Sequence, residues 1–166
     1  MIRALALAFL LAAGPAAAQD DTAVWMLITE GPGAYLAFGV PDSDDGRIAL
    51  HCGDGAGKVT VLAPVSHRVD SRLDESQVWR DMRGRPEPWP VTVTLASGKT
   101  KAQVDGAARP DEMNGGSTIE ADLDVASPVM KAFAASGRLS VSAYDETVEE
   151  PPAPRRDVEI LLRTCR

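Results

Sequence analysis

Residues 47–65, RIALHCGDGAGKVTVLAPV, decide the fold because they hold two strand patterns joined by a glycine-rich turn. In the first half, Ile48, Leu50 and Cys52 occupy alternate positions and so share one face of a strand. The second half, KVTVLAPV, is rich in residues that favour strands. Residues 53–57 supply the backbone freedom of a tight turn. The stretch therefore predicts an antiparallel β-hairpin.

The end of this turn, Gly57-Lys58, has the letters of a phosphate-binding loop. The Walker pattern G-x-x-x-x-G-K-[ST] requires a glycine where Cys52 stands and a hydroxyl residue where Val59 stands. A phosphate loop also leads into a helix, whereas the residues after Lys58 read as a strand. These departures exclude a nucleotide site and leave the hairpin turn.

Alternation with a period of two recurs along the chain. It is clearest in VTVTLASG (91–98), where Val91, Val93 and Leu95 share one face. Further strands are expected at residues 23–30, 33–40, 117–124, 138–145 and 157–164, with a less regular pattern at 99–106. Many short strands separated by Gly, Pro and Asp predict an all-β fold, an antiparallel sandwich or barrel-like domain spanning residues 19–166.

One short helix is expected between Ser127 and Gly137. Ser127 suits the N-cap position, Pro128 the first turn, and Gly137 the position after the last turn. The apolar residues between them, Val129, Met130 and Phe133, recur at helical spacing. We expect this stripe to pack on the sheet or to close one end of it.

The longest irregular segment, residues 66–90, is the expected place for a binding surface. It combines Trp79 and Trp89 with several arginines, among them Arg80. Tryptophan and arginine are enriched at contact surfaces, and long loops in compact domains are often functional. The alternative is that each tryptophan folds back to cover the core. A short helical turn at residues 75–82 is one interpretation of its middle.

The acidic run PDSDDG offers Asp42, Asp44 and Asp45 as candidate oxygen ligands for calcium. An EF-hand is excluded because Gly46 comes one residue early and Cys52 replaces the last glutamate. An acidic turn between two strands is the ordinary interpretation of such a run. We expect no cofactor.

The two histidines, His51 and His67, lack the spacing of a metal-binding pair. No G-x-S-x-G motif is present either. A catalytic triad is assembled in space rather than in sequence, so a small hydrolase remains an alternative to a non-enzymatic protein.

The first residues have the three parts of a secretory leader. Arg3 gives a positive start, residues 4–13 are apolar, and small residues at Ala16 and Ala18 precede Gln19. A spanning helix needs roughly 20 apolar residues, about twice this run. We therefore expect residues 1–18 to be removed and the mature chain to lie in the periplasm or to be secreted, with no later membrane span.

The two cysteines of the chain, Cys52 and Cys165, are expected to form a structural disulfide. Cysteine pairs of exported proteins are usually oxidised. A catalytic pair normally has C-x-x-C spacing, and a metal site needs more ligands than these two.

The charge of the chain argues against some partners. Its 24 acidic and 17 basic residues give a formal net charge of −7. Nucleic acids and anionic membranes are bound mainly through Lys and Arg, so neither is an expected partner.

The strand that ends in Cys52, its glycine turn, and the later SPVMKAFAASGRLSV and DVEILLRTC resemble small exported bacterial β-rich proteins of unknown function. This resemblance covers about half of the mature chain and implies no catalytic residue. IALHCGDGAGKVTV is also similar to periplasmic inhibitors of lysozyme, which are small disulfide-bonded β-barrels with an S-G-x-x-Y loop. Here the corresponding Ser-Gly pairs, at Ser97 and Ser136, are not followed by that tyrosine.

Together these patterns favour a non-enzymatic binding protein that holds an envelope protein or a glycan through loops on a rigid β scaffold. The candidate contact residues are Trp79, Arg80 and Trp89. A secreted hydrolase and an inhibitor of a glycan hydrolase are the alternatives.

Overall fold

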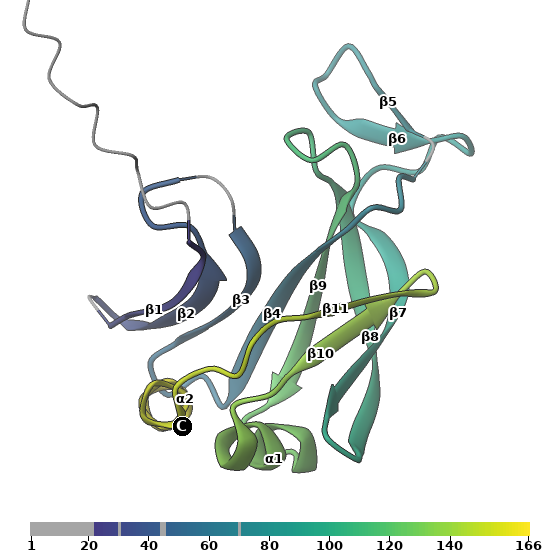
Figure 1. Cartoon of the computed structure of the whole chain (residues 1–166). Helices are drawn as coiled ribbons and strands as arrows, with labels where there is room; N and C mark the ends of the chain where they lie inside the picture. Colours follow the sequence, from purple (N-terminus) through teal and green to yellow (C-terminus); the bar gives the residue numbers. More distant parts are fainter. Residues whose placement is uncertain (1–21, 30, 44–45, 70) are drawn as a thin grey trace, which may run out of the picture.

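The computed structural model describes residues 22–29, 31–43, 46–69 and 71–166, which form mainly antiparallel strands with two short helices (Figure 1). The all-β class expected from the alternating segments is confirmed. The expected leader, residues 1–18, lies outside the described residues, and so do Asp44 and Asp45.

Nine strands of the described chain form one antiparallel sheet. Their spatial order is β1 (Val24–Ile28), β2 (Gly33–Gly39), β3 (Gly46–Gly53), β4 (Lys58–Val65), β9 (Ser117–Asp124), β8 (Thr100–Pro110), β7 (Trp89–Ser97), β10 (Ser140–Ala143) and β11 (Glu146–Glu149). The sheet curls until β11 contacts β4, so that β4 and the strands after it in this order enclose a barrel-like core (Figure 1). The three strands β1 to β3 extend the sheet beyond β4.

The hairpin expected at residues 47–65 is present. β3 and β4 are antiparallel, with Leu50 opposite Val61. Both side chains are buried, as are Ile48 and Val59 on the same inward face. The period of two of the apolar residues therefore corresponds to a pair of strands that bury one face in the core.

The glycine loop of this hairpin holds the end of the described chain. Gly55 and Gly57 have φ angles of 63° and 71°, a conformation that glycine adopts without steric cost. The Gly55 N–H donates to the carbonyl of Thr164 at 3.0 Å, and the Gly57 N–H donates to that of Cys165 at 2.7 Å. The N–H groups that suggested a phosphate cradle are thus occupied by backbone carbonyls.

Beside this loop, the expected disulfide joins Cys52 to Cys165, with their Cα atoms 5.6 Å apart and 113 positions apart in sequence. Cys165 is fully buried in the core cluster. The covalent bond and the glycine loop therefore fix the same segment.

The expected helix is α1 (Pro128–Ser136), and it closes one end of the sheet (Figure 1). Ser127 caps it by accepting a hydrogen bond from the Met130 N–H at 3.3 Å. Phe133 is fully buried. Gly137 follows with a φ of 70°, where an added Cβ would lie 2.2 Å from the carbonyl oxygen of Ala153. Only glycine fits there without moving the backbone.

The strand expected at residues 157–164 is wrong, because this segment is the helix α2 (Arg155–Thr164). Val158, Leu161 and Leu162 are buried, whereas Ile160 is only partly buried. Spacings of three and four residues place these buried side chains on one helical face. That face packs against α1, β2 and β3. The short segment fits a strand period and a helical period equally well, and this packing selects the helix.

The short helical turn interpreted at residues 75–82 of the segment 66–90 is not present. The segment contains instead a two-stranded hairpin, β5 (Ser71–Leu73) and β6 (Trp79–Asp81). Asp74 fixes the turn between these strands by accepting hydrogen bonds from the N–H groups of Ser76 and Val78, at 2.8 and 3.0 Å. Side-chain caps of this kind favour turns over helix.

Two other elements of the sheet exceed what the sequence patterns indicate. β8 runs over Thr100–Pro110, well beyond the less regular pattern at residues 99–106. β11 was not expected, and it pairs with β10 through a turn at Tyr144 and Asp145, both with positive φ. No helix within the described ranges is long and apolar enough to cross a membrane.

Candidate functional site

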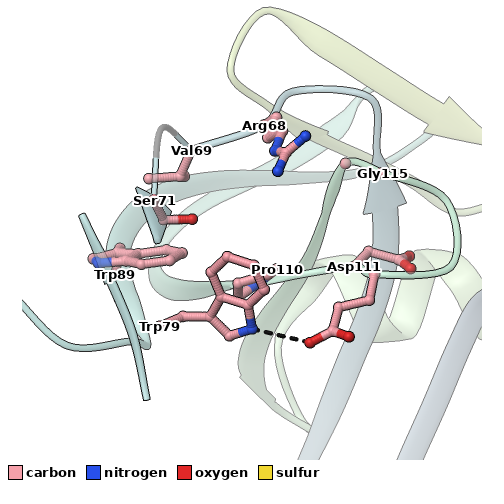
Figure 2. Close-up of a pocket in the computed structure, with 10 residues that line it drawn as sticks. Arg68, Val69, Ser71, Trp79, Trp89, Pro110, Asp111 and Gly115 are labelled. Carbon is pink, nitrogen blue, oxygen red and sulfur yellow. Dashed lines mark hydrogen bonds between the residues drawn. The ribbon is translucent and has the colours of Figure 1, made fainter. Parts of the chain in front are cut away.

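A pocket of about 250 Å³ lies where the projecting hairpin β5–β6 meets the β8–β9 loop (Figure 2). We call residues 66–88 the arm and residues 111–116 the β8–β9 loop. The lining residues are Arg68, Val69, Ser71, Trp79, Trp89, Pro110, Asp111, Glu112, Gly115 and Gly116. The pocket therefore has one wall from the arm and another from the main sheet.

The two tryptophans line the pocket together with the apolar residues Val69 and Pro110. Trp89 begins β7 and is only 3% exposed, and its indole N–H donates to the carbonyl of Arg85 at 3.1 Å. Trp79, on β6, is partly buried, and its indole N–H donates to a carboxylate oxygen of Glu112 at 3.0 Å. This bond, dashed in Figure 2, crosses from the arm to the β8–β9 loop.

Two acidic residues hold the arm in shape. Asp81 is 8% exposed and accepts hydrogen bonds from the N–H groups of Arg83 and Arg85, both at 2.9 Å, and pairs with the Arg85 guanidinium at 2.7 Å. Burial opposes ionisation of Asp81, but these donors outweigh it and lower its pKa. Asp74 likewise pairs with Arg80, and its hydrogen bonds from Val78 and Arg80 lower its pKa.

The β8–β9 loop is organised by Asp111. Its carboxylate accepts hydrogen bonds from the N–H groups of Met113 and Asn114, at 3.1 and 3.0 Å, and from the Asn114 side chain at 3.0 Å. Burial opposes ionisation, but the bonds from Asn114 and Met113 prevail and lower the pKa of Asp111. This carboxylate is therefore ionised and committed to its own turn.

The loop ends in a close backbone contact. A Cβ added to Gly116 would lie 2.0 Å from the carbonyl oxygen of Val65, at the end of β4. The next residue, Ser117, is fully buried, and its hydroxyl has no hydrogen-bond partner among the described residues. Gly116 thus lets the loop reach the sheet, and Ser117 directly follows this pocket-lining residue in sequence.

Arg68 supplies the free positive charge of the pocket. It is exposed, and among the described residues it has neither an ion-pair nor a hydrogen-bond partner. Figure 2 shows Arg68 and Ser71 beside the space between the two tryptophans and Gly115. Five guanidinium donors are therefore open to a ligand.

Contacts of Ser66 and His67, the two residues before Arg68, join the arm to the β10–β11 turn, and we call these contacts the clasp. The N–H and hydroxyl of Ser66 donate to one carboxylate oxygen of Glu146, at 2.8 and 2.9 Å. His67 stacks on Tyr144 with ring centroids 4.0 Å apart. The Ser66 bonds lower the pKa of Glu146 against the opposing effect of burial. The clasp therefore fixes the two residues immediately before Arg68.

The structure brings together two of the three candidate contact residues. Trp79 and Trp89 line the pocket, but Arg80 does not, because its side chain is bound to Asp74 and to the carbonyl of Gly84 at 3.2 Å. Arg68 is the residue that sequence reasoning missed. Arg68 lies just after the end of β4, in the same irregular segment as Trp79 and Trp89. This position is the feature of the sequence that could have indicated it.

The other sequence candidates lie apart from the pocket. Asp42 is exposed with a φ of 57°, and no group of metal-ligating side chains occurs among the residues that the structure describes. Ser97 and Ser136, the serines compared with the inhibitor loop, contact each other with their hydroxyl oxygens 3.1 Å apart. Ser97 is 4% exposed, so this serine is not presented on a protruding loop.

The titratable side chains that line the pocket are those of Arg68, Asp111 and Glu112. Ser71 lines the pocket, but neither His51 nor His67 does. The carboxyl of Asp111 has a lowered pKa, whereas a general acid needs a raised one.

Comparison of the chain with known protein families gave no match, and comparisons with curated proteins and with solved structures gave none either.

Proposed function

We propose that this chain is an exported, non-enzymatic binding protein that holds its ligand in the pocket between the arm and the β8–β9 loop. One observation carries the proposal: two indoles and a guanidinium that has no partner among the described residues line the same pocket of about 250 Å³. Concave sites with apolar walls and a few convergent polar groups are the usual form of ligand sites.

Export is supported by two independent features. The leader pattern of residues 1–18 predicts secretion, and structural disulfides such as Cys52–Cys165 form and persist in oxidising compartments. We therefore assign the mature chain, from Gln19, to the periplasm or the exterior. The disulfide and the glycine loop then act as the rigid base of the scaffold.

The proposal is tested by affinity capture from an envelope extract of the source cells. Immobilised wild-type chain is compared with Trp79→Ala, and with Tyr35→Ala as the control. Tyr35 is 38% exposed on β2 and does not line the pocket. We expect wild type and Tyr35→Ala to retain a common component that Trp79→Ala loses, while all three keep similar melting temperatures.

An unchanged capture profile in folded Trp79→Ala would contradict the proposal. Arg68→Ala serves as the second pocket variant, because the exposed Arg68 side chain makes no hydrogen bond or ion pair within the described chain. Capture that survives both substitutions would place the binding surface elsewhere.

A further inference from the structure

We infer that the pocket takes one neutral sugar ring of a glycan; this inference rests on the binding function proposed above. It is drawn from the size of the pocket, from the state of its two indoles, and from the balance of its charged groups.

Size limits the docking unit to one ring. Clefts for drug-sized ligands span roughly 300–1,000 Å³. The pocket, at about 250 Å³, lies just below that range. An extended peptide needs a long groove, whereas one pyranose ring with its chain leading out to solvent needs a single short pocket.

The two indoles offer the ligand apolar surface and no polar atom. The N–H of Trp89 is bound to the Arg85 carbonyl, and the N–H of Trp79 is bound to Glu112. Both indole donors are therefore satisfied within the protein. What remains for the ligand is chiefly the partly buried ring of Trp79, because Trp89 is only 3% exposed. A flat aromatic ring of this kind fits the C–H face of a pyranose as well as it fits any planar apolar group.

The polar groups around this surface include both donors and acceptors. Arg68 offers guanidinium N–H donors, and the Ser71 hydroxyl can donate or accept. Glu112 uses one carboxylate oxygen for Trp79, and the other accepts no hydrogen bond from the residues that the structure describes. A ring bearing several hydroxyl groups matches this mixture, because each hydroxyl both donates and accepts.

Charge argues against an ionic ligand. The pocket lining holds one guanidinium, Arg68, and two carboxylates, Asp111 and Glu112. The carboxylates disfavour a phosphate or an acidic sugar, and Arg68 disfavours an ammonium group. A neutral polyhydroxylated ring meets neither repulsion, and its hydroxyls gain charge-assisted hydrogen bonds from both kinds of group.

The test uses the indole N–H signals of isotope-labelled chain 19–166 in two-dimensional NMR spectra. The chain has three tryptophans, and Trp→Phe variants assign their signals. The probe is unlabelled envelope extract of the source cells, divided into three portions: untreated, digested with protease, and oxidised with periodate, which cleaves the vicinal diols of sugars. Trp25, which donates to the Pro151 carbonyl away from the pocket, is the internal control.

We expect the Trp79 and Trp89 signals to shift with untreated and with protease-digested extract, but not with oxidised extract. Arg68→Ala should need about ten-fold more extract for the same shift, since the loss of one good contact changes affinity by about that factor. Arg72→Ala is the matched control, because Arg72 is exposed on the same arm and does not line the pocket. The active fraction should pass through an anion exchanger.

Shifts that survive oxidation but vanish on protease digestion would overturn the sugar assignment and make the ligand a protein, while leaving the binding function in place. Retention of the active fraction on the anion exchanger would overturn the neutral ring. No shift with any portion, together with unchanged affinity capture by Trp79→Ala, would overturn the binding function itself.

Discussion

The N–H of Gly57 donates to the carbonyl oxygen of Cys165 at 2.7 Å. This bond joins the glycine turn of the central hairpin to the residue whose side chain forms the disulfide with Cys52. The turn that resembles a phosphate loop in sequence is therefore an internal receptor for backbone carbonyls.

Loss of the disulfide should destabilise the fold strongly. Cys52→Ser or Cys165→Ser should lower the free energy of unfolding by about 2–5 kcal/mol, the usual range for a native disulfide. Denaturant titration of the oxidised protein and of each variant measures this difference. Two reactive thiols per chain in protein denatured without reductant would show that the bond does not form.

Neighbouring glycines in the β8–β9 loop should differ in their tolerance of alanine. Gly116→Ala places a Cβ against the Val65 carbonyl oxygen and should displace the loop, destabilising the protein and enlarging or deforming the pocket. Gly115→Ala meets open space and should cost only the conformational penalty of its φ of 71°, about 1–2 kcal/mol. Equal losses of stability for the two variants would contradict the close contact at Gly116.

Removing the hydroxyl of Ser117 should stabilise the protein. This buried group has no partner among the described residues, and an unsatisfied buried hydroxyl carries a desolvation cost. Ser117→Ala should raise the free energy of unfolding by about 1 kcal/mol. Ser97→Ala, which loses a contact with Ser136, should lower it. A destabilised Ser117→Ala would instead indicate a buried water molecule bound to this hydroxyl.

Acid should weaken the clasp between the arm and the β10–β11 turn. The folded-state pKa of Glu146 lies below its ordinary value of 4.5, so its bonds with Ser66 stabilise the folded state above that pH. This contribution is lost as the pH falls below 4.5 toward the folded pKa. Glu146→Gln should therefore show a shallower loss of stability on acidification, measured by unfolding titrations between pH 6 and 3.

Asp74, Asp81 and Asp111 have lowered pKa values too and shift stability in the same direction. The loss of wild-type stability in acid is therefore the sum of the contributions of these four carboxyl groups, and Glu146→Gln removes one of them. An acid profile identical to that of wild type would show that the clasp does not contribute.

Processing should leave Gln19 as the first residue of the mature protein, because Ala16 and Ala18 occupy the small-residue positions of the cleavage site. Mass spectrometry of the intact protein from the envelope fraction measures this. A mature protein that retains Met1 would contradict cleavage of the leader and leave the disulfide as the one remaining support for export.

Much of the sheet is predictable from sequence because one buried face imposes a period of two. Val93 and Leu95 are fully buried, and their alternation with polar residues indicates β7 directly. The segment of α2 was predicted as a strand because Val158, Ile160 and Leu162 fit a period of two. Val158, Leu161 and Leu162 fit a helical period equally well. Only the surface against which the segment packs separates the two.

The pocket was half predictable. Trp79 and Trp89 stand out by composition, but nothing in composition separates Arg68 from Arg80. The difference is that Arg80 has an acidic partner on the neighbouring turn, Asp74, and Arg68 has none among the described residues. Which arginine is left unpaired depends on the turns of the arm, and those turns are set by side-chain caps that sequence periodicity does not report.

The long span of the disulfide has a consequence for biogenesis. A ribosome makes the chain from its N-terminus, so the thiol of Cys52 exists throughout the synthesis of residues 53–164, which lie between it and Cys165. During that interval it has no native partner. The oxidation step is therefore necessarily late and comes after every strand of the sheet has been synthesised. Cells that oxidise thiols early would trap Cys52 in mixed disulfides, and the yield of native protein would depend on an isomerase to release it.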